Sequence, residues 1–308
     1  MTGALDRESW RAASPRRRRA LARAIAAALG APWTVARDGS LRWRDLPFAI
    51  VPGGRFECGL TAANRATLEA ILARGRRHDE LWEAADDAGE DAEAAIARAG
   101  LDRHAFVDTG ILASMLDELA TARSRTVELA AFLLARAPLS RVAATALGVT
   151  PTSFAADAPV AHVPPGAVPA LLAATGLRLP SEAEWEWAAR GGTGTLWWGG
   201  DEAPLERELH APGAHPFGLA AIGHWRERCA DGWHVRLERA PRDGRPWPGK
   251  GFAVRGGAAA ASPWQGCNEW LMLVPSMRQR GDARAAAWGD AIRLARSIPT
   301  LGPATAAR

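Results

Sequence analysis

Apolar residues recur at helical spacing near the start of the chain. Across residues 14–32 (SPRRRRALARAIAAALGAP), Leu21, Ile25 and Leu29 repeat every four residues, and arginines fill much of the remaining surface. This spacing predicts an amphipathic helix with a solvated arginine face. A twin-arginine-like export signal is the alternative, because such signals also combine a basic cluster, an apolar stretch and small residues. Arg23 interrupts the apolar stretch and favours the helix.

Alternating and helical patterns then follow one another. Residues 40–60 (SLRWRDLPFAIVPGGRFECGL) alternate on both sides of a Pro-Gly-Gly turn, which predicts strands or a hairpin from Leu41 to Leu60. Residues 62–125 carry leucine, isoleucine and tryptophan at helical intervals among many charges, which predicts a helical insertion. The acidic run at 83–95 (EAADDAGEDAEAA) is interpreted as a solvated helix or loop face, because it lacks the ligand spacing of an EF-hand.

The second half of the chain changes character. Residues 127–140 (VELAAFLLARAPLS) are expected to be extended, and from Pro159 onward glycine, proline and tryptophan punctuate many short segments. One helix is sharply bounded: Ser181 and Glu184 have the spacing of a capping box, and Gly191 is suited to the left-handed exit. The patterns together predict a loop-rich α+β fold.

Composition narrows the functional classes. The formal charge is only +4, and Lys250 is the single lysine, so the arginine bias is attributed to codon composition and no nucleic-acid partner is expected. No run approaches the roughly 20 apolar residues of a membrane helix, so no membrane partner is expected either. Cys58, Cys229 and Cys267 are odd in number and far apart, which fits a reducing cytoplasm better than a disulfide framework.

Several segments, in order, resemble the formylglycine-generating enzyme (sulfatase-modifying factor) family. They are FAIVPGGRFECG (48–59), GLRLPSEAEWEWAARGG (176–192), LWWGGDE (196–202), HPFGLAAIGHWRERCADGW (215–233), VRGGAAA from Val254 and AIRLAR from Ala291. The resemblance implies a C-type-lectin-like α+β domain. We expect this domain at residues 46–297, interrupted by the insertion at 62–125, with an N-terminal helix and lead-in strand at 1–45 and a flexible tail at 298–308.

The resemblance also implies a copper site, which this sequence does not complete. The family's oxidases hold copper(I) between two cysteine thiolates shortly after the Arg-Gly-Gly block, and thiolates suit that soft ion. Here Cys267 is the candidate for the second thiolate, but the first position falls among Ala258–Ala261. Cys267 is therefore the only candidate catalytic residue, and its alternative is a packed small hydrophobe.

Iron and calcium, the other metals that the resemblance implies, also lack their expected ligands. The related sulfoxide synthases of ergothioneine biosynthesis bind iron through three histidines, but only two histidines precede residue 162. Four later ones, at 210, 215, 224 and 234, crowd together without regular spacing. At the family's calcium segment, Glu227 matches a ligand position, yet Arg226 and Arg228 flank it. We expect those two arginines to pair with Glu227.

Two hypotheses of different classes follow. The first is a divergent binding scaffold for a protein or a small anionic ligand, with Arg255, Trp264, Arg278 and Arg280 grouped beside Cys267 on the C-terminal face. In the alternative, each arginine is paired with a local carboxylate such as Glu269 or Asp282. The second hypothesis is a metal-dependent oxidase or oxygenase that uses copper or nonheme iron on other ligands.

Overall fold

One antiparallel sheet joins the two ends of the chain. The computed structural model describes residues 5–101, 109–121, 124–152, 160–201, 215–257, 273–281 and 290–301. The sheet has the order β1-β2-β3-β6-β12, all neighbours being antiparallel. Its strands are β1 (Trp33–Val35), β2 (Leu41–Trp43), β3 (Leu46–Val51), β6 (Phe132–Ala135) and β12 (Ala295–Ser297).

The strands predicted at Leu41–Leu60 are present, but a hairpin across the Pro-Gly-Gly turn is not. The strand β3 pairs with β6, whereas β4 (Gly54–Cys58) pairs with β5 (Arg125–Leu129) in a separate ladder. The reason is a close approach: a Cβ atom on Gly53 would lie 2.5 Å from the Leu129 carbonyl oxygen. The chain therefore crosses between sheets at this glycine instead of turning back on itself.

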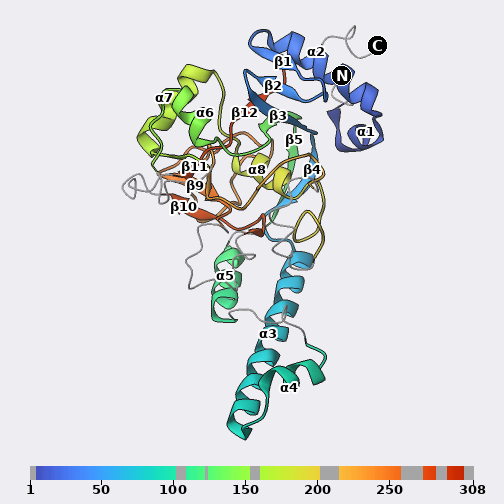
Figure 1. Ribbon diagram of the computed structural model, residues 1–308, viewed down its shortest axis with the longest axis vertical. Helices are drawn as coiled ribbons and strands as arrows, with labels where there is room; N and C mark the ends of the chain where they lie inside the picture. The colour runs from blue at the N-terminus through green and yellow to red at the C-terminus, as the bar shows by residue number, and fades with distance from the viewer. Residues whose placement is uncertain are drawn as a thin grey trace.

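Both faces of the first sheet are buried. Alternate residues of β3 point to opposite sides, so Phe48 and Ile50 join one core cluster while Ala49 and Val51 join another. The helix α2 (Pro15–Leu29) covers the first face through Ile25, and it confirms the predicted amphipathic helix, with most of its arginines exposed. The helix α8 (Glu182–Ala189) covers the second face (Figure 1).

A second sheet lies on the other side of α8. Its order is β10-β9-β8-β11-β7, and its strands are β7 (His162–Val163), β8 (Glu227–Arg228), β9 (Phe252–Arg255), β10 (Gln279–Gly281) and β11 (Asp290–Ala291). Shorter helical pieces flank it: α6 (Arg141–Ala146), the 3-10 turn η3 (Pro165–Ala167) and α7 (Val168–Thr175). With α1 (Arg7–Ala12) they complete a mixed architecture, which confirms the α+β class.

Three helices occupy the range of the expected insertion. They are α3 (Ala62–Ala88), α4 (Ala92–Arg98) and α5 (Thr109–Thr121), and they extend away from the sheets in Figure 1. Leu68 and Leu112 belong to one cluster, which joins α3 and α5 at the end nearest the sheets. Whether these helices and the sheets form one domain stays a prediction. Among the residues that the structure describes, none of the helices combines the length and apolar character needed to cross a lipid bilayer.

Candidate functional site

The helix α8 lies at the centre of the molecule and all its residues are buried. Its start is fixed as the sequence predicts, since the Ser181 hydroxyl accepts from the Glu184 amide at 3.1 Å and the Glu184 carboxylate accepts from the Ser181 amide at 2.9 Å. A further acceptor comes from outside the helix, because Asp231 accepts from the Glu182 amide at 2.7 Å. The N-terminal amides of the helix are thus used within the protein.

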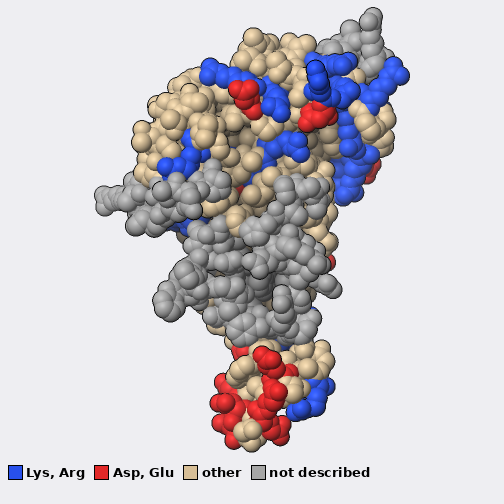
Figure 2. All heavy atoms as spheres, in the orientation of Figure 1, with Lys and Arg blue, Asp and Glu red and all other residues tan. Residues whose placement is uncertain are grey.

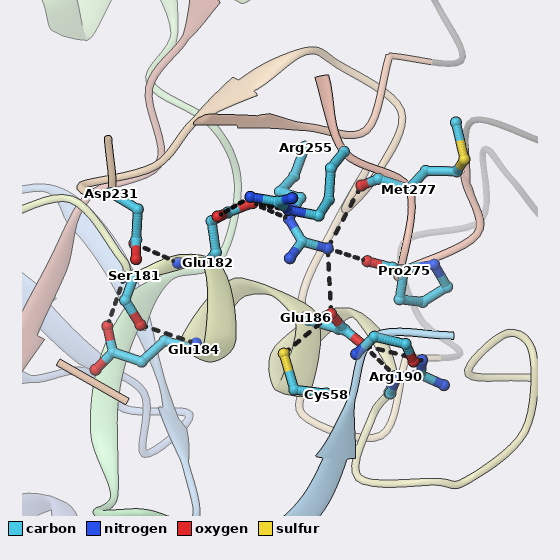
Figure 3. Close-up of polar contacts among 12 residues, drawn as sticks. Cys58, Ser181, Glu182, Glu184, Glu186, Arg190, Asp231, Arg255, Pro275 and Met277 are labelled. Carbon is cyan, nitrogen blue, oxygen red and sulfur yellow. Dashed lines mark hydrogen bonds and ion pairs between the residues drawn. The ribbon is translucent and has the colours of Figure 1, made fainter. Parts of the chain in front are cut away.

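The glutamates of this helix bind arginines from other segments. Glu182 accepts from Arg255 Nε at 3.0 Å and from both Nε and Nη2 of Arg278 at 2.7 Å (Figure 3). Glu186 accepts from Arg190 and, at 3.2 Å, from Arg255 Nη1. Arg255 therefore bridges two glutamates one helical turn apart, and the side chains of all these residues are at most 5% exposed.

The third glutamate of the helix lies nearer the surface. Glu184 binds Arg178 through two hydrogen bonds of 2.6 and 2.7 Å, but the Arg178 side chain is 31% exposed. Water therefore screens this pair more than the inner ones. The helix has one solvated ion pair and two buried glutamates that a network of guanidinium groups neutralises.

The network keeps its buried carboxylates ionised. Burial alone would raise the pKa of Glu182, but Arg255 and Arg278 outweigh it and leave that pKa below its usual value. Glu186 behaves in the same way: burial raises its pKa, but Arg190 and Arg255 outweigh that effect, so the pKa of Glu186 is also below its usual value. Charge-assisted hydrogen bonds of this density hold the interior in one arrangement.

Glu227 has different partners from those that its neighbours in sequence suggest. Its two oxygens accept from Arg293 Nε at 2.7 Å and Nη2 at 2.8 Å, and Oε2 also accepts from Trp185 Nε1 at 2.8 Å. The expected pairing with Arg226 and Arg228 is wrong, because side chains on either side of a strand residue point to the opposite face. Glu227 is fully buried and saturated by these donors, so a cation would have to displace Arg293.

The flanking arginines lie elsewhere. Arg226 binds Asp290 at 3.2 Å, and it also contacts the Gln279 side chain. Arg228 donates to the Pro165 carbonyl at 3.3 Å and stacks on Phe252, 4.0 Å from the ring centroid. Arg226 and Arg228 therefore connect β8 to neighbouring segments, while the Glu227 side chain points into the core.

Three of the predicted C-terminal binding residues, Arg255, Arg278 and Arg280, lie within the described ranges. Arg255 is completely buried and Arg278 is 5% exposed, and both bind Glu182, whereas Glu269 and Asp282 lie outside the described residues. Arg280 is exposed on β10, opposite Ala253. Trp264 and Cys267 lie outside the described residues, so their predicted proximity to Arg255 is not part of this description.

Metal-ligand groups do not gather in the described part of the chain. Within those ranges no three His, Cys, Asp or Glu residues are placed to hold one ion. His215 is buried and His234 stacks on Trp247 at 3.6 Å, so each has its own local environment. His210 falls outside the described residues.

The two described thiols are buried and free of disulfide bonds. Burial and the charge of Glu186 raise the pKa of Cys58 far above its usual value, and its Sγ lies 3.3 Å from Glu186 Oε2 as a hydrogen-bond donor. Burial also raises the pKa of Cys229. Neither sulfur has the thiolate character that a nucleophile or a copper ligand needs.

Sequence reasoning missed the roles of Arg190, Arg293 and Glu182. Arg293 sits between Ile292 and Leu294, both fully or almost fully buried, and it also donates to three backbone carbonyls. An arginine enclosed by apolar residues, here in the link between β11 and β12, is a usable signal of a buried ion pair. The sequence does not signal which carboxylate is its partner, since Glu227 is 66 residues away.

A protein-family model matches one segment of the chain. A model of the sulfatase-modifying factor enzyme 1-like domain (FGE-sulfatase) matches residues 143–216, which includes α8. This match confirms, for that segment, the resemblance indicated by the sequence. No curated protein matches the chain.

Two solved structures are similar to the chain at low identity. PvdO from Pseudomonas aeruginosa is 16% identical, with 82% of this chain and 95% of that chain covered at a TM-score of 0.48. Variable protein 1 from Treponema denticola is 22% identical, with 58% of this chain and 88% of that chain covered at a TM-score of 0.44.

Proposed function

We propose that this chain, whose residues 143–216 belong to the sulfatase-modifying factor enzyme 1-like family, is a divergent member that binds a ligand and does not perform the family's copper oxidation. The observation that carries the proposal is the closed network around α8. Glu182, Glu186 and Glu227 are each neutralised by arginine, so these carboxylates stabilise the scaffold and are not free for chemistry.

The thiol inventory supports the same proposal. The family's copper site needs two thiolates, and the position expected for the first one holds alanine within Ala258–Ala261. Cys58 and Cys229 are not substitutes, because burial favours the neutral thiol over the charged thiolate. Cys267 alone would leave copper(I) with one sulfur ligand. The unpaired cysteines also support our proposal that the protein works in a reducing compartment.

The ligand class follows from the surface charge. Arg255 and Arg278 are occupied by Glu182, so of the predicted binding residues within the described ranges only Arg280 stays exposed. An anionic small molecule or an acidic protein surface remains the ligand that exposed arginines favour.

Two measurements test this proposal. Purified protein is analysed for copper, iron and calcium by mass spectrometry, and a peptide containing Cys-x-Pro-x-Arg is incubated with protein, copper and oxygen. We expect substoichiometric metal and an unchanged peptide thiol. Conversion of the cysteine to an aldehyde, abolished by Cys267→Ser, would overturn the proposal. Stoichiometric iron or copper with oxygen consumption would instead support the metal-dependent oxidase or oxygenase.

A further inference from the structure

A cleft of about 840 Å³ lies where the helix α2, the first sheet and the segment 215–218 meet. Its lining comes from six places in sequence: the end of α1, the helix α2, residues 38–41, the strand β3, Arg136 and residues 215–218. Figure 2 shows basic side chains gathered over the α1 and α2 end of the molecule. The cleft adjoins the buried network, because Arg293 donates to the backbone carbonyl of the lining residue Arg136 at 2.9 Å, but its own arginine side chains are different from those around α8.

Arginines dominate the polar lining of this cleft. Arg16, Arg19 and Arg23 are exposed and recur at intervals of three and four, so they share one face of α2. Arg18 and Arg136 add two more guanidinium groups from other directions. In the described ranges, none of these five forms an ion pair with a carboxylate, in contrast to the arginines around α8.

Several of these cations are held in place by neutral partners. Arg18 donates to the Trp10 carbonyl at 2.9 Å and stacks 5.1 Å from the Trp10 ring centroid. Arg136 donates from Nε to the Gly218 carbonyl at 2.9 Å, and Arg19 donates to the Arg37 carbonyl. Carbonyl oxygens fix a guanidinium group without cancelling its charge, so the positive charges are both positioned and uncompensated.

Among the described lining residues, the one acidic side chain, that of Asp38, does not neutralise these arginines. Asp38 accepts from the Ser40 amide at 3.0 Å and from the Ser40 hydroxyl at 2.7 Å, which closes its own turn. These hydrogen bonds lower the pKa of Asp38, and Arg136 adds a smaller effect. The cleft therefore keeps a strong excess of positive charge.

The position of the arginines on α2 carries a local electrostatic cost. Arg16, Arg17 and Arg18 follow Pro15 in the first turn, where no acidic residue is present and where the helix dipole is positive. Cations in this turn repel the dipole and one another, so α2 alone does not benefit from them. A bound anion would relieve this repulsion.

The cleft also offers an apolar surface beneath the charges. Leu41, Phe48, Ile50 and Phe217 line it, and each is at most 8% exposed. His215 adds no charge at neutral pH, because burial lowers its pKa to about 4. The site thus combines several cationic groups with a hydrophobic floor, as small-molecule sites do.

We propose that this cleft binds a small organic anion that carries two negative charges on an apolar body, such as an aryl phosphate ester. Forked guanidinium donors match the oxygens of these groups, and the apolar floor accommodates the body. The inference rests on the proposed binding function and specifies its ligand class and its location.

The test uses isothermal titration calorimetry with the full chain. Naphthyl phosphate is the aryl ester, and naphthyl sulfate, inorganic pyrophosphate and naphthol are the comparison probes; the single charge of naphthyl sulfate should make it bind more weakly than the phosphate. We expect saturable binding of the aryl ester, weaker binding of pyrophosphate, which lacks the apolar body, and no binding of the neutral naphthol. Affinity should fall as sodium chloride is raised, because exposed charges are screened.

Variants separate the cleft from general surface charge. Arg16→Gln, Arg19→Gln and Arg23→Gln should each weaken binding about tenfold, the effect of about one charge-assisted hydrogen bond. Arg17→Gln is the matched control, because Arg17 is exposed on the same turn of α2 but does not line the cleft. Without ligand, the Arg16→Gln variant should unfold no earlier than the native protein, because it removes one cation from the first turn of α2.

Three outcomes would overturn the inference: no saturable binding of any probe, an equal loss from Arg17→Gln, or tighter binding of a single-stranded oligonucleotide than of the aryl ester through the same arginines. The last would identify a nucleic-acid surface. These outcomes are independent of metal content and of the peptide assay, so the cleft can fail while the proposed non-oxidase function stands.

Discussion

Replacing Glu182 by glutamine should reveal how much the buried network contributes to stability. The substitution keeps the shape of the side chain but removes its charge, and it leaves Arg255 and Arg278 without the carboxylate that accepts three of their hydrogen bonds. Breaking a buried ion pair from one side typically costs about 3–5 kcal/mol, because the remaining charge stays desolvated. Two guanidinium groups are affected here, so we expect the upper part of that range.

Glu184→Gln is the matched control on the same helix. Glutamine also serves in a capping box, and the Arg178 partner is 31% exposed, so its loss should cost about 1 kcal/mol or less. Urea unfolding followed by tryptophan fluorescence measures the loss of stability in both variants. A difference of about 3 kcal/mol between the variants corresponds to a midpoint shift of roughly 1 M urea. Equal midpoints for Glu182→Gln and Glu184→Gln would refute the argument that burial makes the inner pair decisive.

Further predictions concern pH, packing and thiol reactivity. Because the folded-state pKa of His215 is lowered to about 4, its neutral form contributes stability that is present above pH 6.5 and is lost as the pH falls towards 4. In urea titrations, the free energy of unfolding of the native protein should therefore fall by about 3 kcal/mol more than that of His215→Gln between pH 7 and pH 4. Gly54→Ala should lower the free energy of unfolding by about 1–3 kcal/mol, because the new Cβ would lie 2.9 Å from the Trp187 ring; an unchanged midpoint contradicts this. Cys58 and Cys229 should be alkylated by iodoacetamide only after unfolding, which peptide mapping checks, and labelling in the native state would contradict their burial.

Local chemistry explains what the sequence predicts well. The capping box at Ser181, the spacing of Ile25 on α2 and the helical pattern of 62–125 depend on residues within a few positions of one another. The same holds for the acidic run, which lies at the end of α3 and the start of α4. These features need no knowledge of the tertiary fold.

The features that the sequence does not predict depend on pairing between residues far apart in the chain. The partner of Arg255 is 73 residues away and that of Arg278 is 96 residues away, so no local rule identifies Glu182 as their shared acceptor. The Pro-Gly-Gly turn misleads for a related reason, since the close approach of Gly53 to Leu129 depends on a strand residue 76 positions later in the chain rather than on turn chemistry. In both the buried network and the cleft, the fold brings together residues that are distant in sequence.

Two populations of arginine that look alike in the sequence therefore have opposite physical roles. Those around α8 are buried and neutralised, whereas those at the cleft are held by carbonyl oxygens and keep their charge. Acidic side chains gather at the opposite end of the molecule, over α3 and α4 (Figure 2). The formal charge of +4 thus understates the local field at the cleft, since excess positive charge there is separated from the acids that balance it. Such a separation attracts anions over about one Debye length, ~10 Å at 0.1 M salt, and directs them to the α2 end before any contact is made.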